Sequence, residues 1–197
     1  MKKLVLILLV LVVVGGSAFA FDIHSFPAPI EKGNLMITPM VGIGRYWWGG
    51  FALAIPVAIE YALPINFALS VGGETGVAFG FTGGDSFYGT AILVPIMAKV
   101  AWHPNFEVNK LDTYIALKMG VAISFLAGAS EVVKGGVGFA WGFDLGVRYF
   151  FTPKFSISGE LGYDYYMITI KEDWYGGTWK WRWPIGTFLR VGVTFKI

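Results

Sequence analysis

Bulky and small side chains alternate along almost the whole chain from residue 34 onward. In one representative stretch, every second position is large and apolar: Phe139, Trp141, Phe143, Leu145, Val147, Tyr149 and Phe151. The positions between them hold Ala140, Gly142, Asp144, Gly146, Arg148 and Phe150. A repeat of two places the large set on one face of a β-strand, whereas a helix would spread it around its whole circumference. The alternation therefore predicts strands.

The same repeat predicts eight strands. They are expected at residues 34–46, 51–63, 66–81, 88–102, 111–125, 137–151, 155–170 and 183–197. Each is longer than the roughly 9–11 residues that a tilted strand needs to cross a membrane. The connections alternate between a glycine-containing and a proline-containing kind, as expected if each kind lies on one side of a sheet.

The polarity of the two faces decides between a water-soluble barrel or sandwich and a membrane barrel. The non-bulky face of the third predicted strand holds Ala68, Ser70, Gly72, Gly76, Ala78 and Gly80. Such a face makes a poor aqueous exterior but fits the narrow inside of a small closed barrel. Only 14% of all residues are charged, well below the roughly 25–35% of a soluble surface. We therefore predict an all-β fold, an eight-stranded antiparallel up-and-down transmembrane β-barrel with its bulky face toward lipid.

The first 20 residues have the layout of a cleaved secretory signal peptide. Lys2 and Lys3 precede an apolar run from Leu4, and small residues precede the expected cut after Ala20. A retained transmembrane anchor is the alternative, but the run is shorter than the ~20 residues that a spanning helix needs. We expect residues 21–33 to form a periplasmic leader and residues 34–197 the barrel. Without Lys2 and Lys3 the chain is formally neutral, which argues against nucleic acid as a partner.

Three segments in the second half of the chain carry a resemblance to known proteins. They are residues 142–154, with the sequence GFDLGVRYFFTPK, residues 158–163, with SGELGY, and residues 189–195, with LRVGVTF. Together they resemble the small outer-membrane barrels of the OmpA/OmpX type. The resemblance implies a porin-like outer-membrane protein at the cell surface of a Gram-negative-type envelope, inserted by the barrel-assembly machinery. Such barrels usually end in an aromatic residue that the machinery reads, whereas this chain ends Phe195-Lys196-Ile197.

If the small-residue face points inward, ten charged side chains enter the lumen. The acids are Glu60, Glu74, Asp144, Glu160 and Asp164, and the bases are Lys99, Lys118, Arg148, Arg190 and Lys196. Because an unpaired charge away from water costs several kcal/mol, we predict that these groups form a network of ion pairs. Positions counted back from the turns favour Asp164 with Arg190, and Asp144 with Lys118.

This lumen network has two interpretations. A polar plug that closes the lumen is favoured, because eight strands leave little more than side-chain room inside. A charged constriction in a narrow pore is the alternative. Such a pore would be a channel for small or apolar solutes, as in the similar OmpW-type barrels.

An aromatic and charged segment, residues 171–182, has the sequence KEDWYGGTWKWR. We predict an outer-loop contact surface at Trp174, Tyr175, Trp179 and Trp181, suited to a lipid headgroup, a glycan or a host protein. The alternative is that the last hairpin extends above the membrane and continues the aromatic girdle.

The expected partners are outer-membrane lipid, the assembly machinery and an extracellular ligand or small solute. The protein itself is expected to be a monomer.

No arrangement typical of an enzyme stands out. The two histidines are His24, before the first strand, and His103, in a proline-containing turn, where a histidine is usually solvated. Glu160 and Asp164 lie four residues apart on one strand face, but neighbouring basic groups would hold both ionised. With no cysteine and no metal-ligand spacing, we expect no catalytic activity, no metal and no cofactor.

Overall fold

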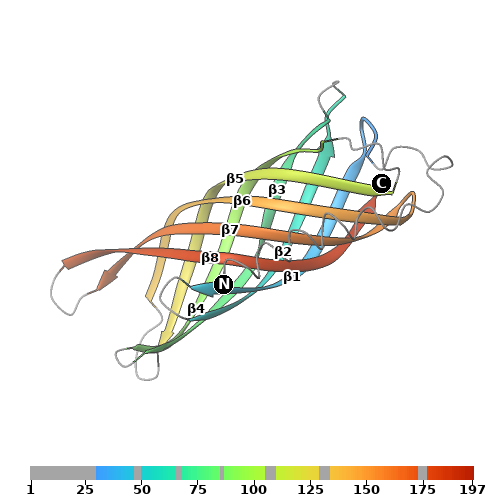
Figure 1. Cartoon of the computed structure of the whole chain (residues 1–197). Coiled ribbons are helices and arrows are strands. Elements are labelled where there is room, and N and C mark those ends of the chain that lie inside the picture. Colours follow the sequence, from blue (N-terminus) through green and yellow to red (C-terminus); the bar gives the residue numbers. More distant parts are fainter. Residues whose placement is uncertain are drawn as a thin grey trace.

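The computed structural model describes residues 30–46, 50–64, 68–84, 87–104, 110–128, 134–172 and 177–197. Its strands form a closed barrel, in which each strand is antiparallel to its two neighbours and the first pairs with the last (Figure 1). The strands are β1 (Leu35–Tyr46), β2 (Phe51–Ala62), β3 (Leu69–Gly84), β4 (Phe87–Trp102), β5 (Leu111–Gly128), β6 (Lys134–Thr152), β7 (Phe155–Glu172) and β8 (Gly177–Lys196). This confirms the predicted eight-stranded antiparallel barrel.

The N-terminal segment lies largely outside the described residues. The predicted signal peptide falls there entirely, as does the predicted leader up to residue 29. Within the described ranges, no helix is long and apolar enough to span a membrane.

The strand ends agree with the sequence predictions to within three residues except at the last hairpin. There β8 begins at Gly177, six residues before the predicted start, and β7 continues to Glu172. Lys171 pairs with Thr178 and Glu172 with Gly177, so the prediction of a loop over residues 171–182 is wrong for the described part of that range. The hairpin projects from the barrel at the end opposite the C-terminus (Figure 1), as the alternative interpretation predicted.

The outer wall of the barrel carries the bulky side chains. Leu145 is 43% exposed and Val191 is 59% exposed. The same surface carries large apolar residues from every strand, among them Ile43, Ile55, Phe81, Ile96, Leu117, Phe139, Leu161 and Leu189. Only lipid can cover such a belt favourably, because water would leave all of this apolar surface solvated. The predicted orientation of the two faces is therefore confirmed.

The inside of the barrel contains two layers of side chains. Toward the end where β2 begins, an apolar layer is formed by Ala52, Ala54, Ala78, Ala91, Leu93, Met97, Ala122, Ala140, Tyr166 and Phe188. Toward the end where β1 begins and β8 ends, a polar layer contains buried acids, bases and hydroxyl groups. We call this second end the terminal end. The strand alternation explains both layers, because inward positions lie two apart on every strand.

Glycine makes room for the largest side chains of the polar layer. A Cβ atom at Gly146 would overlap the ring of Tyr114, and one at Gly162 would lie 2.7 Å from Asp144 Oδ1 and 2.9 Å from an Arg190 nitrogen. Both glycines occupy inward positions. The long charged side chains therefore fit into the narrow lumen only because some of their neighbours have no side chain.

Candidate functional site: the buried charge network

The polar layer gathers charged side chains from seven of the eight strands. They are Glu60 on β2, Glu74 on β3, Lys99 on β4, Asp112 and Lys118 on β5, Asp144 and Arg148 on β6, Glu160 and Asp164 on β7, and Arg190 on β8. All ten are buried. Each lies within ion-pair distance of at least one group of opposite charge. Burial of so many charges is tolerated only because they neutralise one another.

Lys118 lies at the centre of the network. Its Nζ is 2.8 Å from Glu74 Oε1, 3.0 Å from Asp144 Oδ2 and 3.0 Å from Asp164 Oδ1. The ammonium group donates a hydrogen bond to Glu74 and forms ion pairs with Asp144 and Asp164, so it joins carboxylates from three different strands. The pair of Lys118 with Asp144, expected from the sequence, is present in this arrangement.

Arg190, on β8, shares Asp144 and Asp164 with Lys118 and also pairs with Glu160. Its Nη1 lies 2.6 Å from Glu160 Oε1 and 3.2 Å from Asp144 Oδ1. Its Nη2 is paired with Asp164, which is the other pair expected from the sequence. The guanidinium therefore bridges β6 and β7 while it stays attached to β8.

A second cluster lies closer to the terminal end. Arg148 donates to Glu60 at 2.5 Å and to Asp112 at 3.2 Å, and its guanidinium lies 4.2 Å from the centre of the Tyr114 ring. Lys99 connects this cluster to the first, because its Nζ is 3.5 Å from Glu60 and 3.3 Å from Glu160. The two clusters therefore form one continuous network.

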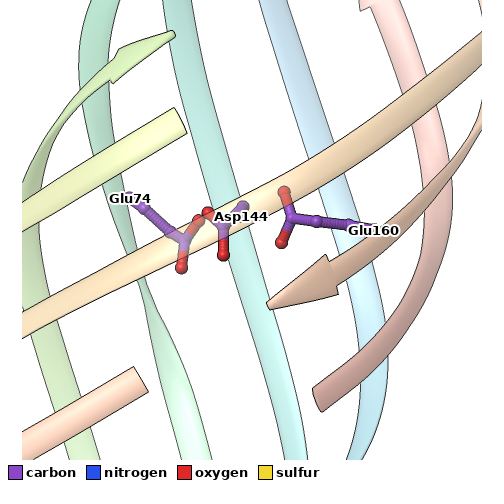
Figure 2. A group of neighbouring side chains, drawn as sticks. All are labelled: Glu74, Asp144 and Glu160. Atoms are coloured by element: carbon purple, nitrogen blue, oxygen red, sulfur yellow. The ribbon is translucent and has the colours of Figure 1, made fainter. Parts of the chain in front are cut away.

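Three carboxylates of the network are the best candidates for a metal site. Figure 2 shows Glu74, Asp144 and Glu160 directed toward one another, and one oxygen of each lies within 4.8 Å of the others. However, Lys118 and Arg190 already donate to these groups. The basic side chains supply the positive charge that a metal ion would otherwise bring, so the geometry favours an internal ion-pair network over a metal centre.

One part of this layer was not predicted from the sequence. His103 was expected to be solvated, but it is only 2% exposed, so that prediction is wrong. Its Nε2 lies 2.9 Å from Ser70 Oγ, and its Nδ1 lies 2.8 Å from Asp112 Oδ1. The available signal was strand parity, because Ser70 shares a face with Glu74 on β3, and Asp112 shares one with Lys118 on β5.

The remaining predicted site residues lie elsewhere. Lys196 is near the end of β8, where its Nζ is 5.7 Å from the centre of the Phe150 ring. Trp179 and Trp181 belong to β8 and pair with Ile170 and Ile168. The other two predicted contact residues, Trp174 and Tyr175, lie outside the described residues.

Three features together define a class: closed strand pairing, a lipid-facing apolar belt and a lumen that contains buried side chains. A sheet can lie in hydrocarbon only when it has no open edge, and this one has none. The chain is a transmembrane β-barrel of the outer-membrane type. This class lies in the bacterial outer membrane, which is where the fold and the belt place this chain.

Comparison with known proteins agrees with this class. No protein-family model and no curated protein matches the chain. Among solved structures, it is similar to Neisserial surface protein A, with a TM-score of 0.59 and 13% identity over 83% of this chain and 96% of that one. The outer membrane protein OprG from Pseudomonas aeruginosa gives 0.55 and 13% over 87% and 99%. Ail of Yersinia pestis, in complex with the heparin analogue sucrose octasulfate, gives 0.51 and 12% over 85% and 100%. At these identities the likeness concerns the fold.

Proposed function

We propose that this protein is a structural outer-membrane barrel whose lumen is closed by the buried ion-pair network. The observation that carries the proposal is the burial of Arg148, Arg190 and Lys99, which are among the largest fully buried side chains of the described residues. An open aqueous pore at this height would leave such groups hydrated. The proposed partners of the monomer are outer-membrane lipid and the barrel-assembly machinery, and no catalytic role is proposed.

The direction of the ion pairs supports a plug. Arg148 on β6 reaches Glu60 on β2, and Lys99 on β4 reaches Glu160 on β7. These strands are not neighbours in the sheet, so the pairs cross the lumen instead of following the wall. A solute would have to break several charge-assisted hydrogen bonds to pass.

Planar-bilayer recording of the purified barrel tests this proposal. We expect no stable unitary conductance from the wild type. The double variant Lys118→Ala with Arg190→Ala removes the central bases and should give discrete current steps, whereas the control Leu189→Ala changes only the lipid-facing neighbour. Circular dichroism verifies that each variant is folded. Stable unitary conductance from the wild type would refute the plug and favour the narrow-channel alternative.

A surface-contact role is proposed for the projecting hairpin of β7 and β8. Its backbone ladder continues to the pair Glu172 and Gly177, whereas the β1–β2 ladder ends at the pair Arg45 and Phe51. An ordered hairpin beyond the membrane can present contacts at a lower entropy cost than a loose loop. Segment 171–182 holds three bases, Lys171, Lys180 and Arg182, against the two acids Glu172 and Asp173. Because the segment has a net positive charge and Ail was solved with a heparin analogue, a sulfated glycan is the first probe.

The matched experiment compares a pair of tryptophans in the hairpin with a single tryptophan at the opposite end of the barrel. Trp179→Ser with Trp181→Ser should abolish binding of sucrose octasulfate, measured by calorimetry. Trp102→Ser, at the terminal end, should leave it unchanged. Absence of binding by the wild type, or equal binding by all variants, would contradict the contact role without affecting the plug.

A further inference from the structure

Four residues form a hydrogen-bonded chain at the terminal end of the lumen. Ser70 Oγ donates to Glu60 Oε2 over 3.0 Å and lies 2.9 Å from His103 Nε2. His103 Nδ1 lies 2.8 Å from Asp112 Oδ1. All four side chains are buried, so each of their hydrogen bonds must be made within the protein.

Counting protons assigns the state of the imidazole ring. A serine hydroxyl has one proton, and that of Ser70 goes to the Glu60 carboxylate, so Ser70 must accept a hydrogen bond from His103 Nε2. The Asp112 carboxylate can only accept, so His103 Nδ1 must also donate. Both ring nitrogens donate only in the imidazolium form.

The charge of the polar layer agrees with this assignment. Among the described residues, six buried carboxylates face four buried lysine and arginine side chains. A protonated His103 supplies a fifth positive charge, placed between two of these carboxylates, since its Nε2 is also 4.0 Å from Glu60 Oε2. An uncompensated buried charge is costly, and a proton on His103 reduces the excess of negative charge from two to one.

The surroundings of His103 contain charges of both signs. Glu60 on β2 and Asp112 on β5 face it, and both also accept from Arg148 on β6. Lys99, on β4 and four residues before His103, contacts Glu60, and the Tyr114 ring lies 5.8 Å from the imidazole. Arg148 and Lys99 are thus each paired with carboxylates. Asp112 contacts Arg148 through one oxygen and His103 through the other.

We propose that Ser70, His103, Asp112 and Glu60 form a proton-binding site at the terminal end of the lumen, in which protonated His103 joins the end of β4 to β2, β3 and β5. The proposal deepens the plug and rests on it. Without that proton the ring has one donor fewer, and either Ser70 or Asp112 loses its hydrogen bond. The proton on His103 therefore helps to close this end of the lumen.

The same distances would also suit a serine nucleophile with a histidine base and an aspartate behind it. Two observations disfavour that interpretation. Ser70 is 0% exposed, and its proton is directed to Glu60 and not to the ring. An imidazolium cannot accept the serine proton, so the proton-binding site and the nucleophile exclude each other.

Nitrogen-15 NMR of the imidazole tests the proposal directly. The chain has two histidines, so His24→Gln leaves His103 as the only signal in the folded barrel. We expect two ring N–H groups in the folded barrel at neutral pH. Asp112→Asn removes the carboxylate that accepts from Nδ1 and should leave a ring with a single N–H. A neutral ring with a single N–H from about pH 5 upward would overturn the proposal, as would covalent labelling of Ser70 by a fluorophosphonate.

Functional readouts separate this site from the plug. His103→Gln should lower the urea concentration at which the barrel unfolds, because a neutral amide cannot replace the positive charge between Glu60 and Asp112. If the wild type conducts at every pH, the plug itself fails. If the wild type stays closed and His103 is neutral throughout, the plug stands and the proton-binding site is wrong.

Discussion

The two layers inside the barrel fill similar space in opposite ways. In the apolar layer, short side chains such as Ala52 and Ala140 pack beside a few large ones such as Phe188. In the polar layer, Arg148 and Lys99 extend across the lumen to carboxylates on distant strands. Packing in the apolar layer is non-directional, whereas the ion pairs specify which strands face each other. The apolar layer therefore fills the barrel, whereas the polar layer fixes which strands face each other across the lumen.

Removal of one central base should have the largest effect. Lys118→Met keeps the length of the side chain but leaves Glu74, Asp144 and Asp164 with one partner fewer. Breaking a buried ion pair from one side costs about 3–5 kcal/mol, so urea unfolding of the variant in detergent should show a loss of that size. A loss below about 1 kcal/mol would mean that water reaches these carboxylates.

Coupling across the lumen should be the next largest effect. In a double-mutant cycle with Arg148→Met and Glu60→Gln, the double variant should lose less stability than the sum of the two single variants. Contacting charged residues show coupling energies of about 0.5–3 kcal/mol. Simple additivity, measured by the same unfolding assay, would show that β2 and β6 are not joined through this pair.

A comparable change in the apolar layer should cost less. Met97→Leu keeps the volume and the apolar character of a buried side chain, so the expected loss is under about 1.5 kcal/mol. The comparison with Lys118→Met is direct, because each variant replaces one buried side chain by one of similar size. Equal losses of stability in the two layers would contradict the distinction between a layer that fills space and a layer that fixes the strand arrangement.

The lipid-facing wall should be the most tolerant region. Leu145→Ala shortens a side chain that points into lipid or detergent, which closes over the change and leaves no cavity. The loss, measured by unfolding in detergent, should therefore stay below the roughly 2–5 kcal/mol of the same change in a protein core. A large loss would place Leu145 in a protein core and reverse the assignment of the two faces.

The fold was predictable because a period of two determines the faces of a strand. Alternation around Leu145 and Val191 placed these residues on the outer wall, and the structure agrees. The start of β8 was not predictable in this way. The segment after Gly177 is rich in charge and tryptophan, and a backbone ladder that continues past the apolar belt has no hydrophobic signature of its own.

The network was predictable only in part, for a related reason. Parity identifies inward residues, but the stagger of the strands decides their height in the barrel. Neighbouring pairs such as Asp164 and Arg190 follow from turns, whereas Arg148 with Glu60 requires the closed barrel. His103 was missed because a position in a turn was taken as solvated, although it lies in the lumen. Ser70 was placed on the inward face, but no partner was predicted for it.

Cysteine accessibility tests the sealed lumen most directly, because the chain has no native cysteine. Ser158→Cys places a thiol in the lumen, beside Thr194, whose hydroxyl lies 2.6 Å from the native serine. Val191→Cys places one on the lipid-facing wall. In the folded barrel, the thiol at position 158 should resist a water-soluble maleimide and react after unfolding, while the thiol at position 191 should react with an apolar maleimide from the membrane. Rapid aqueous labelling at position 158 in the folded protein would contradict a lumen closed by its own side chains.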